Sequence, residues 1–229
     1  IGTPAVLLRS GIGPRAELER HGIPVVVERD GVGANLRDHI ASGILVATRP
    51  GVETLATAET IRNLLRWLLA KRGPLTSNVA EAAAFLRSDP SLPAPDLELV
   101  FAPVPFENEG MTRPSFAGFT VATVLLQPRS LGTVRLRSAD PTAEPLIDPA
   151  FLTDPAGDDR RLLLHGLRLA RRVAGSEPLA AFAAEERLPG DDHVTDDELT
   201  VHLRAQSQTL YHPVGTCRLG DDAGSVVDP

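Results

Sequence analysis

Apolar residues recur at helical spacing between Glu59 and Arg72, and the pattern ends at Gly73 and Pro74. The recurring positions are Ile61, Leu64, Leu65, Leu68 and Leu69. Residues three and four apart lie on the same side of an α-helix. The stretch therefore predicts an amphipathic helix that stops at the Gly-Pro pair.

Two later stretches also carry helical patterns. From about Asp158 to Ala174, apolar and basic residues occupy opposite sides, acidic residues stand at the first turn, and Gly175 follows the last. The run "TDDE", from Thr195 to Glu198, is a capping-box pattern that precedes Leu199 and Leu203. Both stretches predict helices with a buried apolar side.

Near the N-terminus, Pro14 and Gly22 are expected to bound a short helix in which Leu18 faces inward. The run "IPVVVE" that follows predicts a buried strand, and Ile44 to Thr48 predicts another extended segment. The stretch "SNVAEAAAFLRS" is rich in helix-forming alanine and predicts a further short helix.

Between Asp96 and Arg137 the pattern changes to β-type runs, "LELVFAPV", "GFTVATVLLQP" and "GTVRLR", which are separated by Pro, Gly and Asn clusters. Such runs are typical of an antiparallel sheet. Together with the helices they indicate a mixed α+β fold with an antiparallel sheet and flanking helices.

Composition excludes several classes of protein. The 229 residues are 42% hydrophobic and 23% charged, which is ordinary for a globular chain that buries its own core. No run approaches the roughly 18 apolar residues of a membrane span, so we expect a soluble protein without a transmembrane segment. The net charge of −7 argues against a nucleic-acid partner. Cys217 is the single cysteine, so an internal disulfide is impossible.

The ends of the sequence suggest a longer protein. Ile1 stands where a methionine or a signal segment would begin a complete chain, and the sequence stops on the extended run "GSVVDP". We therefore expect an internal piece of a longer protein. Its location is taken as cytoplasmic by default, because a targeting segment would lie outside the piece.

Several chemical motifs are missing or incomplete. The only lysine, Lys71, precedes Arg72, which rules out a Walker phosphate loop. Gly11 to Gly13 and Gly31 to Gly33 lack the third glycine of a dinucleotide fingerprint. The spacing of Cys217 from His212 does not match a zinc site, so no metal is expected. A Gly-x-Ser-x-Gly elbow is absent, which removes the reason to expect a nucleophilic serine.

The run "YHPVGTCRLG", residues 211–220, holds the one histidine that is followed directly by proline. An imidazole can take a proton from a hydroxyl near neutral pH, and the proline restricts the backbone beside it. One interpretation is therefore that His212 is a general base. The alternative is that it stands at the C-terminus of a helix and interacts with the helix dipole.

Four stretches, in order, resemble the glucose-methanol-choline (GMC) oxidoreductases, which are flavoenzymes that oxidise alcohols. They are "GTPAVLLRSGIGP", "GIPVVVERDGVGANLRDHI", "PRSLGTVRLRSADPTAEPLIDPAFL", and "YHPVGTCRLG" with "VVDP". The resemblance spans almost the whole chain. It implies flavin adenine dinucleotide (FAD) as the cofactor and an alcohol as the substrate.

The resemblance also implies a mechanism. His212 matches the family's active-site base, which accepts or hydrogen-bonds the hydroxyl proton while a hydride passes from the carbinol carbon to flavin N5. Residues 1–40 would belong to a Rossmann-like FAD-binding domain whose N-terminal part is missing. Residues 41–210 would form the substrate-binding domain, and residues 211–229 would return to the FAD domain.

Further site residues follow from the same resemblance. Asn35, Asp38 and His39 match the family's "NLxDH" loop near the cofactor, or they simply hold a polar turn together. The remaining cofactor positions are Gly13 and Pro14, which would shape the backbone near the flavin, and Gly215 and Thr216, which would shape the turn after the base. Asn78 and Glu81 fall in a segment, "GPLTSNVAEAAAF", that would line the substrate cavity.

Two departures from the family pattern keep other functions open. The complete glycine fingerprint and the second active-site residue, His or Asn, would lie outside this sequence. A stand-alone binding module that has lost catalysis would also lack the fingerprint. A hydrolase that uses His212 would need an activated serine nearby. The sequence leaves open which alcohol is oxidised, and whether oxygen, a quinone or a carrier protein accepts the electrons.

Overall fold

The computed structural model describes residues 1–229 as two compact units. Unit 1 is built from residues 1–39, 128–159 and 209–229, and unit 2 from residues 40–127 and 160–208. Residues 128–159, which fall inside the expected range 41–210, group with the two ends of the chain in unit 1. Whether unit 1 belongs to an FAD-binding domain and unit 2 binds substrate stays a prediction.

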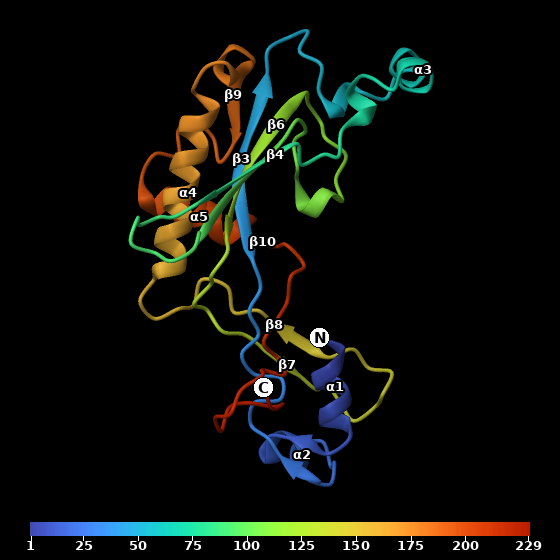
Figure 1. The fold of residues 1–229 in the computed structure, drawn as a ribbon, viewed down its shortest axis with the longest axis vertical. Coiled ribbons are helices and arrows are strands. Elements are labelled where there is room, and N and C mark those ends of the chain that lie inside the picture. The colour runs from blue at the N-terminus through green and yellow to red at the C-terminus, as the bar shows by residue number, and fades with distance from the viewer. The chain divides into compact units, whose positions relative to one another are not determined.

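Unit 2 is organised around an antiparallel sheet, as predicted, with the strand order β10-β3-β6-β5-β4 and with β9 also paired to β3 (Figure 1). The strands are β3 (Ile40–Thr48), β4 (Ala82–Leu86), β5 (Leu97–Ala102), β6 (Gly118–Leu125), β9 (Ala183–Leu188) and β10 (Gln208–Thr209). The strands β3 and β6 are rich in β-branched and small residues and are buried along most of their length.

Two helices cover one face of this sheet, α4 (Asp158–Ala174) and α5 (Asp196–Gln206) (Figure 1). Gly166 lets α4 approach closely, because a methyl group added there would overlap the hydroxyl of Thr123 on β6. The capping box at the start of α5 is formed as predicted, since the Thr195 hydroxyl accepts the N–H of Glu198 and the Glu198 carboxylate accepts that of Thr195. Leu199 and Leu203 are fully buried.

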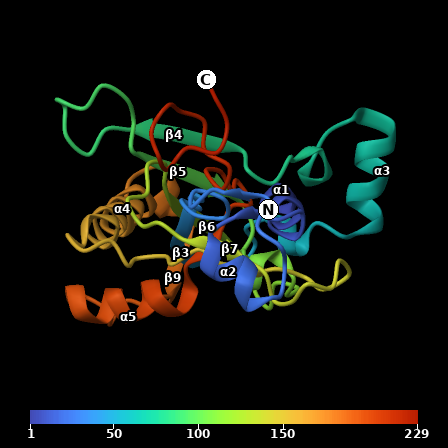
Figure 2. The same ribbon diagram turned by 90° about the horizontal axis from the view of Figure 1, so that it is seen from below.

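The predicted amphipathic helix is confirmed as α3 (Ile61–Ala70), which stands apart from the sheet in both views (Figures 1 and 2). Thr60 caps its start, and Lys71, in a left-handed conformation, ends it. Unit 2 also contains four short 3-10 helices: η1 (Leu55–Thr57), η2 (Pro74–Thr76), η3 (Asn108–Gly110) and η4 (Leu179–Ala181). None of the helices is both long and apolar enough to span a bilayer.

Two predictions of secondary structure were wrong. The stretch "SNVAEAAAFLRS" forms the strand β4 rather than a helix, because pairing with β5 outweighs the helical preference of its alanines. The run "IPVVVE" forms only the two-residue strand β2 (Val27–Glu28), and Val26 and Val27 are exposed rather than buried. Its partner, β1 (Ile12–Gly13), is also only two residues long, so β2 cannot form a longer ladder of backbone hydrogen bonds.

Unit 1 combines small elements from distant parts of the sequence. They are α1 (Gly2–Arg9), β1, α2 (Arg15–Arg20), β2, β7 (Thr133–Arg135) and β8 (Leu146–Asp148). Its core contains Ala5, Leu8, Leu18, Val32 and Leu136, which confirms the inward position of Leu18. The buried carboxylate of Glu17 accepts the backbone N–H of Leu136 at 2.8 Å and pairs with Arg135 at 2.7 Å, so one side chain ties α2 to residues more than 100 positions away.

Candidate active site

His212 lies in a segment that the buried carboxylate of Asp38 holds at two points. Asp38 Oδ1 accepts the backbone N–H of His212 at 2.9 Å, and Asp38 Oδ2 accepts the hydroxyl of Thr209. The N–H of Leu210 donates to the carbonyl of His39 at 3.0 Å. Since α5 ends at Gln206, six residues earlier, His212 does not cap that helix. The segment is therefore fixed by the loop that contains Asp38.

The imidazole rings of His212 and His39 meet edge to face. Their Nδ1 atoms are 3.1 Å apart, the ring centroids are 5.1 Å apart, and the ring planes differ by 77°. One Nδ1 must donate a proton while the other accepts it. The contact leaves Nε2 of His212 outside this hydrogen bond, and the His212 side chain is exposed. The hydrogen-bonding partner of His212 is thus a second imidazole rather than the serine that a hydrolase would need.

The turn after His212 is joined to the same loop by backbone hydrogen bonds. Arg37 and Val214 exchange two N–H to carbonyl bonds, of 3.0 and 2.8 Å. Gly215 adopts a left-handed backbone with a φ of 91°, and a methyl group added there would overlap the carbonyl oxygen of Asn35. Asn35 itself has a φ of 56°. Only glycine fits this close approach between the two loops.

The structure brings the predicted residues Asn35, Asp38, His39, His212 and Gly215 together in unit 1. Thr216 is buried in the same turn, where its carbonyl accepts the N–H of Gly33 at 2.9 Å. The remaining two residues, Gly13 and Pro14, have structural roles. The Leu8 side chain fills the space in front of Gly13, and Pro14 is the N-cap residue of α2. Their contact with a cofactor stays a prediction.

Asn78 and Glu81 belong to unit 2, whereas His212 belongs to unit 1. Both residues are exposed at the turn that leads into β4. The Glu81 N–H donates to the carbonyl of Phe101 at 3.0 Å, and the neighbouring Val79 has a φ of 73°. The side chains are therefore accessible on a defined turn, and their role toward a substrate stays a prediction.

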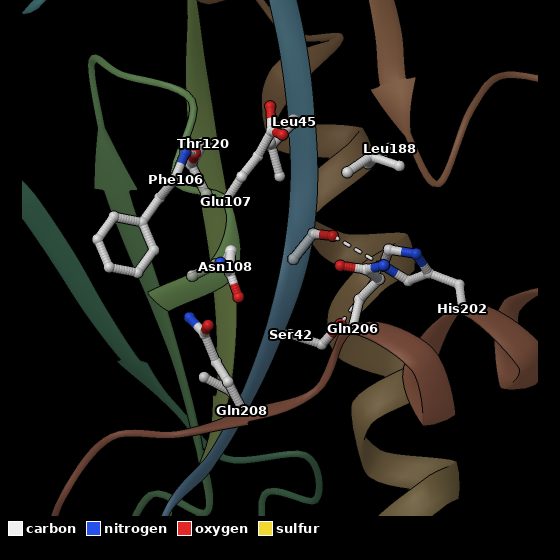
Figure 3. A pocket seen from close by; sticks show the side chains of 13 residues that line it. Ser42, Leu45, Phe106, Glu107, Asn108, Thr120, Leu188, His202, Gln206 and Gln208 are labelled. Atoms are coloured by element: carbon white, nitrogen blue, oxygen red, sulfur yellow. Dashed lines mark hydrogen bonds between the residues drawn. The ribbon is translucent and has the colours of Figure 1, made fainter. Parts of the chain in front are cut away.

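Sequence reasoning missed His202, a buried residue of α5 that lies beside a small cavity of about 50 Å³ in unit 2. Figure 3 shows Phe106, Asn108 and Gln208 on the opposite side of β3 from His202. Nε2 of His202 lies 3.1 Å from the carbonyl oxygen of Gly43 and 3.4 Å from the Ser42 hydroxyl. A carbonyl only accepts, so Nε2 carries the proton.

The role of His202 is structural. Strand β9 pairs with β3 only from Leu45 onward, so the His202 side chain supplies the donor for the Gly43 carbonyl just before that pairing begins. Burial lowers the pKa of His202 below the ordinary value, because the charged form would lose its hydration. One feature of the sequence could have predicted the burial of His202. It lies three residues after Leu199, which places it on the buried side of α5.

Comparison with known proteins points to one family. Residues 128–229 match the family model described as GMC oxidoreductase. The whole chain is 42% identical to an uncharacterized GMC-type oxidoreductase of Mycobacterium tuberculosis and covers 43% of that protein. It is 36% identical over its whole length to alcohol dehydrogenase [acceptor] of Pseudomonas putida and covers 42% of it.

A solved structure of Aspergillus oryzae formate oxidase, studied for modification of its FAD, superposes on 99% of this chain with a TM-score of 0.85 and 27% identity, and the chain covers 45% of it. The predicted cofactor of the family, FAD, is consistent with that structure. The chain spans less than half the length of the curated relatives it matches. Residues 128–229 thus match the GMC oxidoreductase family, and the whole chain is similar to GMC-type oxidoreductases, as its sequence motifs predict.

Proposed function

We propose that the whole protein is an FAD-dependent oxidoreductase of alcohols and that this chain supplies its general base, His212. The single observation that carries the proposal is the hydrogen bond between the Nδ1 atoms of His212 and His39, on a segment clamped by Asp38. A general base needs a fixed ring and a free nitrogen, and this arrangement offers both at His212.

The residues around His212 suit a flat cofactor. Tyr211 and Val214, on either side of it, are exposed, although their backbone is tied down by hydrogen bonds to Thr209 and Arg37. A rigid, exposed and partly apolar edge is a suitable surface for an aromatic ring system. Asp38 and Gly215 would act by fixing the backbone of this edge, while Asn35 and His39 would stand beside it.

When bound, FAD would supply the oxidising chemistry, as the acceptor of a hydride from the alcohol. The task of His212 is to accept the hydroxyl proton at Nε2. For Nε2 to be free of a proton beforehand, His212 must carry its proton on Nδ1 and donate it to Nδ1 of His39. His39 would then hold its own proton on Nε2, and its role is to position the base and select its tautomer.

The test is His212→Ala in the whole enzyme, with flavin reduction by the alcohol followed anaerobically. Loss of a positioned base slows the reaction by about 10² to 10⁴-fold, so we expect a decrease of that order at unchanged FAD content. His165→Ala is the matched control, since His165 is an exposed histidine of α4. A near-normal rate in His212→Ala would remove His212 from the mechanism. A whole protein that binds no FAD would favour the binding-module alternative.

A further inference from the structure

Helix α3 turns its polar side toward the rest of unit 2. Asn63 is only 3% exposed, and its amide nitrogen donates to the Glu53 carboxylate at 2.9 Å and to the Ala58 carbonyl at 3.1 Å. Arg66, three residues later on the same side, lies 3.7 Å from Glu53. The contacts that hold α3 in place are therefore polar, which reverses the usual orientation of an amphipathic helix on a globular protein.

The apolar side of α3 faces outward. Ile61 is 79% exposed and Leu69 is 85% exposed, while Leu64, Leu65 and Leu68 are exposed by about half. We call these five residues the leucine face. They recur at intervals of three and four residues, so they form one continuous stripe along the helix. Figures 1 and 2 show α3 projecting away from the sheet of unit 2.

The same segment is strongly basic. Between Ile61 and Arg72 there are four cations, Arg62, Arg66, Lys71 and Arg72, and no acidic residue, although the chain as a whole has a net charge of −7. The Lys71 ammonium lies 4.5 Å from the centre of the Trp67 ring, which places an aromatic and a cation together beside the leucine face. Leucine, tryptophan and basic residues on a short exposed helix are the composition of a helix that lies in a membrane interface.

We propose that α3 docks on the surface of an anionic lipid bilayer, with the leucine face in the interface between headgroups and acyl chains and with Arg62, Lys71 and Arg72 toward the anionic headgroups. Charge favours this occupant over a second copy of the chain. Arg66 is paired with Glu53, but a two-fold contact through α3 would still bring Arg62, Lys71 and Arg72 of two copies against one another, which is repulsive. The inference is independent of the proposed oxidoreductase function, since it uses no residue of the His212 site.

The 229 residues contain a single tryptophan, Trp67, so the tryptophan fluorescence of this chain reports on α3. The experiment is titration with vesicles of phosphatidylcholine mixed with phosphatidylglycerol, and in parallel with vesicles of phosphatidylcholine alone. We expect a blue shift of Trp67 emission and co-sedimentation with the anionic vesicles, at least about tenfold tighter than with the neutral ones, because each cation near an anionic surface contributes about 1 kcal/mol. Added salt should weaken the binding.

Two variants separate the contributions of apolar surface and charge. The pair Leu65→Glu and Leu69→Glu should abolish binding, and the pair Arg62→Gln and Arg72→Gln should reduce the preference for anionic vesicles. Val201→Glu is the matched control, because Val201 is 66% exposed on another helix, α5, and should leave binding unchanged.

Three results would overturn the proposal. The first is the absence of any blue shift of Trp67 emission, and the second is equal affinity for both kinds of vesicle. The third is a wild-type dimer in sedimentation equilibrium that becomes monomeric in the Leu65→Glu, Leu69→Glu variant, combined with no binding to vesicles.

Discussion

Asp38 and His212 are 174 positions apart in the sequence, yet the Asp38 carboxylate accepts the backbone N–H of His212 at 2.9 Å. The same buried carboxylate accepts the Thr209 hydroxyl through its other oxygen. Both oxygens bind the 209–212 segment, so Asp38 influences the His212 side chain by holding this segment in place. Its removal should therefore disturb both the stability of unit 1 and the position of the imidazole.

We expect Asp38→Ala to lower the free energy of unfolding by about 2 kcal/mol, since two hydrogen bonds to a buried charged acceptor are lost. Chemical denaturation of the purified protein measures this change. Asp38→Asn keeps one acceptor oxygen and should lose less. The interpretation fails if both variants are as stable as the wild type.

For His39, the expected result depends on whether the replacement can still accept a hydrogen bond. His39→Leu should slow flavin reduction in the whole enzyme by about tenfold or more, because Nδ1 of His212 loses the acceptor that selects its tautomer. His39→Asn retains an acceptor oxygen and should recover much of the rate. The Michaelis constant should change little in either variant. Equal rates in the two variants would show that acceptance by His39 is unimportant.

Gly215 and Gly51 form a matched pair for testing the loop contact. Both have a positive φ, 91° and 87°, but Gly51 has open space around it, whereas Gly215 abuts the Asn35 carbonyl. Gly51→Ala should cost about 1 kcal/mol, the price of the backbone conformation alone. Gly215→Ala should cost about 2 kcal/mol more, because the two loops have to separate. Thermal denaturation distinguishes these values, and similar losses in both would refute the steric argument.

His202 should make stability depend on pH. Its pKa is lowered by burial in the folded protein, while in the unfolded chain it is about 6.5. Below pH 6.5 the unfolded state therefore binds a proton that the folded state excludes, so the free energy of unfolding falls as the pH falls and levels off below the folded pKa.

The variant His202→Gln retains an N–H donor for Gly43 and does not titrate. Its stability between about pH 5 and 7.5 should show a flatter profile than that of the wild type. His165→Gln, on the exposed side of α4, is the control and should keep the wild-type profile. A profile for His202→Gln as steep as that of the wild type would assign the dependence to other groups.

The local sequence pattern predicted helices correctly where the apolar spacing and the residues at the helix ends agree. The helix α4 begins and ends where its acidic first turn and Gly175 predict, and the capping box fixes the start of α5. Pattern failed at β4, whose alanines favour a helix until β5 supplies a partner. It failed again at "IPVVVE", where the β-branched residues lack a partner long enough to form a ladder.

The candidate site was predictable as a set of residues but not as an arrangement. The motifs identified His212, Asp38 and His39. The hydrogen bond between the two imidazoles joins positions 173 apart, so no periodic pattern in the sequence predicts it. His202 was missed for a different reason. Its spacing from Leu199 indicates burial but not a hydrogen-bonding role. Its partner is a backbone carbonyl whose availability depends on where β9 stops pairing with β3.

Unit 1 is assembled from three separate stretches of sequence, with the stretches of unit 2 between them. During synthesis on a ribosome, which proceeds from the N-terminus, the Asp38 loop emerges before both stretches of unit 2, and its partner segment at 209–212 emerges after them. The Asp38 loop can therefore meet the His212 segment only after both stretches of unit 2 have been synthesised. A nascent chain interrupted before Thr209 would have made all of α3, α4 and α5 and still possess no base.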